Sequence, residues 1–462
     1  MKTICERLVE FTQAIEFQEL PSEVIREAGR RVLDALGCMT AGIQRSTSQQ
    51  VRGAMMELGG IQESTILGTG DLTSCEKATL VNCTSLRFLD YMDGYLGSSP
   101  CHVCFNIPPI LAVAERARAN GRQLVTALVV AYEIMPRFLE CTGLSRLSSR
   151  GWAGGINLEF SVPLAIAPLL GLETEQIVNA LAISITHGNA LDTSSGGQMP
   201  ASKSIVDGMT AMNSVIATLL AKQGISGPHE AIEGPGGYTS SVAGTCDYDQ
   251  LLAPVVRYKI LDTSTKWHNT VKCARTAVPA ALEIIRDHSL NWRDIASLQI
   301  GLTRRDWEHQ AHDPSGGRTR PKTRDAANHS VRYGVAAALV DGELGPDQYE
   351  PEKLHSPQIL DLIDRMSLYW EESHDAYWPS ANPATIKIRT KEGQDLSRTV
   401  TFAPGHPKNP LPDEALEQKF RQLTRNTLDP GKMEGIIAAT RNLADLPDAR
   451  DLTRIIRPSV TR

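Results

Sequence analysis

Two aspartates and a histidine lie close together in the stretch LDYMDGYLGSSPCHVC, from Leu89 to Cys104. Asp90 and Asp93 are three residues apart, so both would project from one face if this segment were helical. Their neighbours are largely apolar, which predicts a buried segment, and buried carboxylates are costly unless they are paired or used. His102 follows in a Gly/Ser/Pro-rich loop, where nearby carboxylates would tune its protonation. The pattern favours acid–base chemistry over a solvated helix face.

The two cysteines of this stretch form a C-x-x-C pair, Cys101 and Cys104. A structural zinc site needs four ligands, usually from a second such pair or a pair of histidines, and the sequence has no second pair at suitable spacing. A thioredoxin-type pair follows a strand and opens a helix, whereas this one lies in helical and loop sequence. Packing inside a folded loop is therefore the favoured interpretation, with a metal or redox site as the alternative.

Two groups of cations could bind a negatively charged substrate. Lys203 follows a Gly/Pro loop and is expected to open a helix, whose amides and the ammonium would suit a carboxylate, although a surface lysine fits the spacing equally well. Lys266, His268, Lys272 and Arg275 fall within ten residues, where helical sequence gives way to mixed sequence. Interdomain clefts are common binding sites, and such a cluster would suit a polyanionic substrate.

Several classes of protein lack support in the sequence. The chain of 462 residues has a net charge of −6 with no basic stripe, which argues against nucleic-acid binding. The Gly-rich stretch GPHEAIEGPGGYTS lacks the lysine and spacing of a P-loop, and no serine or cysteine lies in a nucleophile elbow. The N-terminus does not read as a signal peptide, and the longest apolar run, around residues 124–132, is too short to cross a membrane. Nine scattered cysteines fit a reducing compartment, so we expect a cytoplasmic protein.

The predicted secondary structure changes along the chain, from helices in the first half to a mixture of helices and strands later. Up to about residue 250 the apolar residues recur at helical spacing, as in SEVIREAGRRVLDALG, PPILAVAERARANG and QLVTALVVAYEIMPRFLE. Gly37 is available to end the first of these helices, and an Asn-Gly pair to end the second. Later, ASLQIGLTR alternates like a half-buried strand, and ATIKIRTKEGQDLSRTVTF reads as a hairpin. The tail EALEQKFRQLTRNTL returns to helix.

This change from helical spacing to strand-like alternation predicts a mainly α protein with a second, α+β domain. We expect a large helical bundle from residues 1–255 and 405–462, built from both chain ends, and an inserted, smaller α+β lid domain from residues 256–404.

The chain resembles the MmgE/PrpD family, which includes 2-methylcitrate dehydratase, cis-aconitate decarboxylase and an iminodisuccinate epimerase. SLRFLDYMDGYLGSSPCHVCFNIPPILAVAE is similar to the family's signature of an aspartate pair, a loop histidine and a helix that begins Pro-Pro-Ile-Leu. LLGLETEQIVNALAIS, GGQMPASKSIVDGMTA, NHSVRYGVAAALVDGEL and SHDAYWPSANPATIKIRTKEG resemble further segments. The match is collinear over nearly the whole chain.

The resemblance implies a homodimer and catalysis without a metal or organic cofactor. It also implies an active site that includes Asp93, His102 and Lys203, with Asp90 and the second-domain residue Tyr333 as less specific matches. The chain departs from the family in places. It lacks the aspartate of the usual His-Pro-x-Asp motif after His102, and it carries Ala153 and Ala277 where histidines are common.

Together these features predict a lyase for a small di- or tricarboxylic acid, with 2-methylcitrate dehydratase-like dehydration leading. The alternatives are cis-aconitate-type decarboxylation, epimerisation or isomerisation of a dicarboxylate, and a non-catalytic carboxylate-binding relative. His102 or Asp93 would be the base, and Tyr333 would protonate a leaving hydroxyl. Lys203 and a cation of the later cluster would hold carboxylates and stabilise charge. The predicted catalytic residues are Asp93, His102, Lys203, Lys266, His268 and Tyr333, and the predicted substrate-binding residues are Asp90 and Arg275.

Overall fold

The chain folds into two compact units. The computed structural model describes residues 2–95, 97, 101–188, 190–195, 200–313 and 317–457. Unit 1 takes its described residues from 2–195, 200–263 and 412–457, and unit 2 from 264–411. The predicted domain boundaries, 255/256 and 404/405, fall slightly earlier in the chain.

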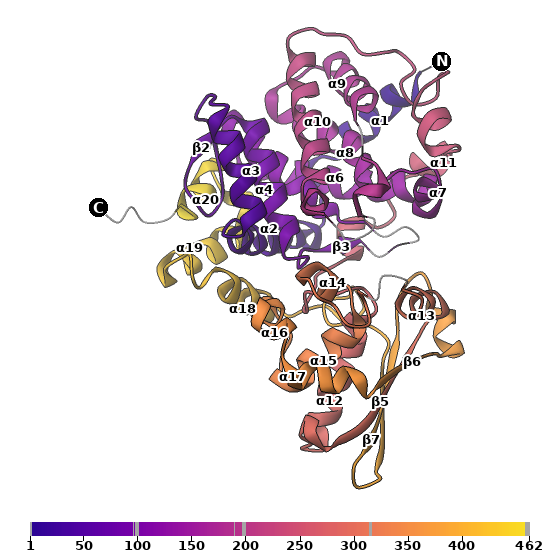
Figure 1. The fold of residues 1–462 in the computed structure, drawn as a ribbon. Helices are drawn as coiled ribbons and strands as arrows, with labels where there is room; N and C mark the ends of the chain where they lie inside the picture. Colours follow the sequence, from indigo (N-terminus) through magenta and orange to yellow (C-terminus); the bar gives the residue numbers. More distant parts are fainter. Residues whose placement is uncertain are drawn as a thin grey trace. The chain divides into compact units, whose positions relative to one another are not determined.

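Unit 1 consists of helices from both ends of the chain (Figure 1). Its N-terminal part also holds the two-residue strands β1 (Ser64–Thr65), β2 (Leu72–Thr73) and β3 (Gly94–Tyr95). The α-helices are α1 (Ile4–Gln13), α2 (Ser22–Gly42), α3 (Ser46–Glu57), α4 (Cys75–Phe88), α5 (Ile107–Ala117), α6 (Gly121–Thr142), α7 (Leu144–Ser149), α8 (Leu158–Ile166), α9 (Thr174–His187), α10 (Val206–Lys222), α11 (Tyr248–Leu251), α18 (Asp413–Thr424), α19 (Pro430–Arg441) and α20 (Arg450–Ile455).

Helix α2 does not end at Gly37, so that prediction is wrong. The helix continues to Gly42, and Gly37 lies inside it, facing the C-terminal helix α18. A Cβ at Gly37 would lie 3.3 Å from Phe420 and from Leu423, so the missing side chain lets α18 approach closely. Figure 1 shows the yellow C-terminal helices α18 and α19 beside α2. The close approach of the two chain ends therefore explains this glycine.

The Asn-Gly pair expected to end a helix instead begins one. Helix α5 ends at Ala117, where Arg118 adopts a left-handed conformation. Asn120 then caps α6: its side chain accepts from the backbone N–H of Gln123, and the Gln123 side chain accepts from the Asn120 N–H, each at 3.0 Å. This reciprocal capping box satisfies two amides that the helix itself leaves without partners.

Unit 2 is built around a four-stranded sheet. Its strand order is β6 (Met366–Trp370), β5 (Ile295–Leu302), β7 (Ala384–Thr390), β8 (Asp395–Val400). Strand β5 runs parallel to β6 and antiparallel to β7, and β7 and β8 form the predicted hairpin. Strand β4 (Thr263–Ser264) lies where the chain passes from unit 1 to unit 2. The helices are α12 (Ala274–Asp287), α13 (Arg304–Ala311), α14 (Arg324–Asn328), α15 (Val331–Asp341), α16 (Pro351–Leu354) and α17 (Pro357–Asp364).

Each unit has its own main apolar core, and a small further cluster in unit 1 holds Ile43, Ile66 and Val81. Helix α12 packs against β7, β8 and α15, so Leu298, Ile300 and Ile386 of the sheet are fully buried in the core of unit 2. A separate, larger core holds the helices of unit 1 together. The prediction of a mainly α protein with an α+β second part is confirmed. No helix within the described ranges combines the length and hydropathy that a membrane crossing requires.

Candidate active site

The aspartate pair does not share a helix face. Helix α4 ends at Phe88, and Asp90 follows in a left-handed turn with a φ of 50°. Its carboxylate accepts a hydrogen bond from Arg87 at 2.8 Å. Asp93 lies beyond the helix and is 1% exposed. The two aspartates therefore lie in different surroundings. They do not project from one helix face, as their spacing had predicted.

The Asp93 carboxylate is surrounded by donors from distant parts of unit 1. The Tyr132 hydroxyl donates to Oδ2 at 2.7 Å, the backbone N–H of Cys104 donates to Oδ1 at 3.3 Å, and the Arg31 guanidinium lies 3.8 Å from Oδ2. Burial raises the pKa of Asp93, while Arg31 and the hydrogen bond from Tyr132 act in the opposite direction. Both carboxylate oxygens are thus engaged inside the protein, an arrangement that suits a positioning residue.

Two buried cations hold the segment that carries Asp93. Arg31 also pairs with Glu27 and donates to the Thr263 carbonyl at 2.8 Å. Lys419, from α18, donates to Asp34 at 2.6 Å and to the Tyr91 carbonyl at 2.8 Å. Its ammonium lies 3.9 Å from the centre of the Tyr91 ring. Helices α2, α6 and α18 thereby fix the backbone between α4 and β3.

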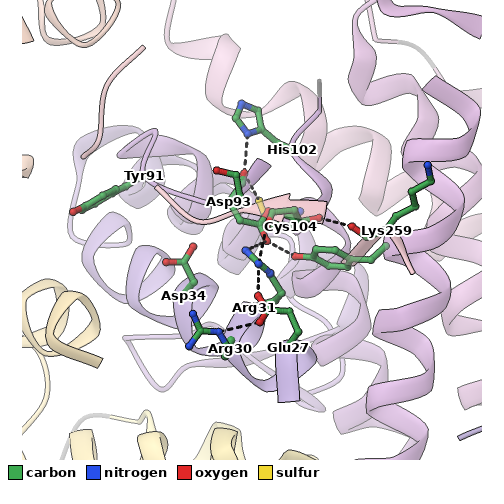
Figure 2. Close-up of polar contacts among 12 residues, drawn as sticks. Glu27, Arg30, Arg31, Asp34, Tyr91, Asp93, His102, Cys104 and Lys259 are labelled. Atoms are coloured by element: carbon green, nitrogen blue, oxygen red, sulfur yellow. Dashed lines mark hydrogen bonds and ion pairs between the residues drawn. The ribbon is translucent and has the colours of Figure 1, made fainter. Parts of the chain in front are cut away.

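His102 is held by the backbone of Asp93. Its Nδ1 lies 3.0 Å from the Asp93 carbonyl oxygen, and Figure 2 shows the ring on that side of Asp93, away from the buried Arg31 network. A carbonyl can only accept, so this hydrogen bond requires the proton on Nδ1 and leaves the lone pair of the neutral ring on Nε2. Asp93 thus orients His102 through its main chain while its carboxylate anchors the segment.

The two cysteines of the C-x-x-C pair both carry free thiols. Cys101 forms a backbone bridge with Tyr95, and buried Cys104 donates to the Asp93 carbonyl at 3.7 Å. Within the parts of the chain that the structure describes, no three His, Cys, Asp or Glu side chains gather as a metal site would require. The Ser and Pro residues just before Cys101 lie outside the described residues.

Lys203 lies in a short 3-10 turn, Ala201–Ser204, and α10 begins only at Val206. It therefore precedes the helix that it was expected to open. The Gly196-Gly197 pair of its loop lies outside the described residues. Lys203 is buried. Burial raises the pKa of the nearby Asp207, and the charges of Arg87 and Lys203 partly offset that rise. Arg87 also pairs with Asp90. Lys203 therefore belongs to a charge cluster in unit 1 that also holds Arg87, Asp90 and Asp207.

The predicted cations of the later cluster belong to unit 2, where Lys266, His268 and Arg275 are all buried. His268 donates from Nδ1 to the Leu344 carbonyl at 3.0 Å. Burial lowers the pKa of His268 to about 4, and the nearby charge of Arg275 acts in the same direction. His268 is therefore neutral near pH 7, and positive charge at this place comes from Lys266 and Arg275.

Tyr333 lies in the core of unit 2. It is fully buried in α15, its ring packs against Tyr349, and its hydroxyl donates to the Gln348 carbonyl at 2.6 Å. Burial raises its pKa. These contacts favour a structural role over that of a proton donor.

Sequence reasoning missed the residues that support Asp93. Arg31, Asp34 and Lys419 are charged but almost fully buried, and Tyr132 is buried in the middle of α6. A signal existed for two of them, because Arg31 and Asp34 lie in the sequence among the buried apolar residues of α2. Lys419 pairs with a residue 385 positions away, which no local pattern indicates.

Comparison with known proteins identifies the family. The MmgE/PrpD N-terminal domain matches residues 6–251, and the MmgE/PrpD C-terminal domain matches residues 268–445. Human cis-aconitate decarboxylase is 24% identical, covering 99% of this chain and 95% of its own length. The cis-aconitate decarboxylase-like protein oryM of Aspergillus oryzae is 22% identical over 98% of this chain and 97% of its own. The 2-methylcitrate dehydratase of Escherichia coli K12 is 24% identical over 86% of each chain.

Decarboxylases and dehydratases are both lyases, so these named relatives share one class of enzyme. The chain belongs to the MmgE/PrpD family, and it is a lyase.

Proposed function

We propose that the protein removes CO2 or water from a small di- or tricarboxylic acid by acid–base chemistry at a carbon next to a carboxylate. The observation that carries this proposal is the hydrogen bond between His102 Nδ1 and the Asp93 carbonyl. It fixes the tautomer of a half-buried histidine and directs the reactive lone pair to Nε2.

His102 moves the proton. In dehydration, Nε2 takes the proton from the carbon next to the substrate carboxylate, and the imidazolium formed in this way gives that proton to the hydroxyl group, which leaves as water. In decarboxylation, the C–C bond to one carboxylate breaks and CO2 departs. The electron pair left on carbon then takes a proton from the imidazolium form of His102. Nδ1 keeps its proton and its bond to the Asp93 carbonyl in both reactions, so the ring does not need to turn.

Lys203 holds a substrate carboxylate and stabilises the negative charge that develops on the neighbouring carbon. The position of Lys203 supports this role, because Lys203 is buried in the charge cluster that also holds Arg87, Asp90 and Asp207. From the second half of the chain, Lys266 and Arg275 remain predicted ligands of substrate carboxylates.

Decarboxylation of a cis-aconitate-like acid is the leading reaction. The relatives with that name match at least 95% of this chain, and the dehydratases 72–86%. In addition, Tyr333, the predicted acid for a leaving hydroxyl, is engaged in the core of unit 2. Dehydration of a 2-methylcitrate-like acid is the second candidate, supported by the named dehydratases.

The test is an NMR time course in D2O with cis-aconitate, citrate, 2-methylcitrate and related acids in one sample. Loss of CO2 indicates a decarboxylase, loss of water a dehydratase, and deuterium exchange without net conversion an epimerase. Ligand binding without any turnover would contradict the proposal and leave a carboxylate-binding relative.

Substitution of the two central residues tests the mechanism on whichever acid is converted. His102→Ala and Lys203→Ala should each lower kcat by roughly 10²–10⁴-fold, the usual contribution of a well-placed acid, base or charge. His229→Ala, which changes an exposed histidine of unit 1, is the control and should leave kcat unchanged. Near-full activity of His102→Ala with native circular dichroism would exclude His102 as the proton carrier.

We also propose that the protein is a homodimer, as the resemblance implies. Light scattering coupled to gel filtration measures this directly, and a monomer at micromolar concentration would contradict it.

A further inference from the structure

We propose that Cys141 and Cys246 form a redox-sensitive thiol pair that closes to an intramolecular disulfide. Their Sγ atoms lie 2.8 Å apart, although the residues are 105 positions apart in the sequence. A disulfide bond measures about 2.05 Å, so the sulfur atoms need to approach by only about 0.8 Å. Both residues belong to unit 1, and both carry free thiols.

The loop that carries Cys246 is held in place by two arginines. From the end of α7, Arg150 donates to the Val242 carbonyl at 2.7 Å and to the carbonyls of Ser240 and Ser241 at 3.2 Å. Arg146 donates to the Thr245 hydroxyl, next to Cys246. Cys141 lies in the last turn of α6 and donates to the Phe138 carbonyl at 3.3 Å. The two thiols therefore meet because both backbones are anchored.

The pair differs from the other seven cysteines of the chain. Cys5, Cys38, Cys75, Cys83, Cys104 and Cys273 are buried and Cys101 is half-buried, whereas Cys141 and Cys246 bring two sulfur atoms into contact. Cys246 is half-buried and Cys141 is buried, so a reagent from solution reaches Cys246 first. The hydrogen bond with Cys246, and then burial, raise the pKa of Cys141, which makes its thiol a slow partner in the second step.

The oxidant in this proposal is a low-molecular-weight disulfide, RSSR. The Cys246 thiolate attacks one sulfur of RSSR, RS⁻ leaves and takes up the proton, and a mixed disulfide forms. The Cys141 sulfur, after loss of its proton, then attacks the Cys246 sulfur and displaces the second RSH. In sum, two protein thiols are oxidised to one disulfide and RSSR is reduced to two RSH.

The bridge closes a covalent loop around the segment that carries Lys203. Residues 142–245 lie between the two cysteines and include α8, α9 and α10. A cross-link over about 100 residues strongly restricts the unfolded chain, so the oxidised protein should be the more stable form. The proposal does not depend on the reaction that the enzyme catalyses.

The full-length protein is incubated with oxidised glutathione, blocked with N-ethylmaleimide and digested without reduction. Mass spectrometry should find one peptide pair joined through Cys141 and Cys246, lighter by two hydrogen masses than the sum of the reduced peptides. Dithiothreitol should separate the pair. The Tm should rise by several °C on oxidation and return on reduction.

Three variants keep the test decisive. Cys141→Ser should stop at a mixed disulfide on Cys246, and Cys246→Ser should form no bridge. Cys75→Ser, which removes a buried thiol outside the pair, should oxidise like the wild type. If glutathione or another cysteine occupies Cys246 in the wild type and no Cys141–Cys246 peptide forms, the proposal fails. A bridge that leaves the Tm unchanged would overturn the stabilising role.

Discussion

A buried ion pair in unit 1 and a buried lysine in unit 2 are two different arrangements of charge. In unit 1, Asp34 is paired with Lys419 at 2.6 Å, and Asp93 accepts from Tyr132 with Arg31 nearby. In unit 2, burial lowers the pKa of Lys272 to about 8, and its ammonium has no hydrogen-bond partner among the described residues; it lies 4.1 Å from the centre of the Trp378 ring.

The difference indicates two roles for a buried charge, one in stability and one in binding. Paired charges in unit 1 fix one backbone conformation, because each group would be costly to bury without its partner. A desolvated cation in unit 2 is held at a cost to stability, and such a cost is typical of residues retained for binding. The comparison implies that removing the Lys419 charge destabilises unit 1, whereas removing the Lys272 charge does not destabilise unit 2.

The largest expected effect comes from breaking the Asp34–Lys419 pair. Lys419→Met should lower the free energy of unfolding by about 3–5 kcal/mol, because it leaves a buried carboxylate uncompensated. Urea denaturation followed by circular dichroism measures the loss. The double variant Asp34→Asn/Lys419→Met should recover part of it, and a double variant as unstable as the single one would show that Lys419 acts mainly through the Tyr91 carbonyl.

The next effect is a pH dependence that belongs to unit 2. The pKa of His268 is lowered to about 4, below its unfolded value of about 6.5, so the unfolded state binds the proton first. Stability is therefore fully present above pH 6.5 and falls as the pH drops toward 4, by a total on the order of 3 kcal/mol.

His268→Asn should remove this part of the acid sensitivity, because an amide can still donate to the Leu344 carbonyl but does not titrate. The measurement is the free energy of unfolding of both proteins at pH 7.5, 6 and 4.5. Parallel curves for the two proteins would contradict the neutral, buried state of His268.

Two buried tyrosines provide a matched pair of smaller changes. Tyr132→Phe removes the donor to Asp93 Oδ2 and should cost about 1.5–3 kcal/mol of stability and lower kcat about tenfold, because Asp93 orients His102. Tyr333→Phe removes the donor to the Gln348 carbonyl, should cost about 1 kcal/mol and leave kcat unchanged. A large loss of kcat in Tyr333→Phe would restore its predicted role as an acid.

The sequence predicted much of the fold, because apolar periodicity is a local signal. The helical spacing in α2, α5 and α6 and the alternation in β5 led to the correct type of element in each case. Helix ends were less predictable. Gly37 does not end α2, because it is a glycine that allows close contact with Phe420. The Asn-Gly pair was expected to end a helix, but Asn120 caps the start of the next one.

The candidate site was predicted in part. Residue types and the family resemblance pointed to Asp93, His102 and Lys203, and the structure places Asp93 and His102 in direct contact. The buried partner Lys419 was out of reach, because its ion pair with Asp34 joins residues 385 positions apart in the chain.

The last prediction has the opposite sign and is the sharpest test of the comparison. Lys272→Met makes the same chemical change as Lys419→Met, yet it should raise the free energy of unfolding at pH 7, by about 1–3 kcal/mol. The gain from removing a desolvated ammonium, on the order of 3 kcal/mol, is partly offset by the lost interaction with the Trp378 ring, which is worth about 0.5–2 kcal/mol. The folded pKa of about 8 lies below the unfolded value of about 10.4, so the stabilisation should vanish as the pH rises from 8 to above 10. A loss of several kcal/mol at pH 7 would mean that Lys272 is paired as firmly as Lys419, and that the two units use buried charge in the same way.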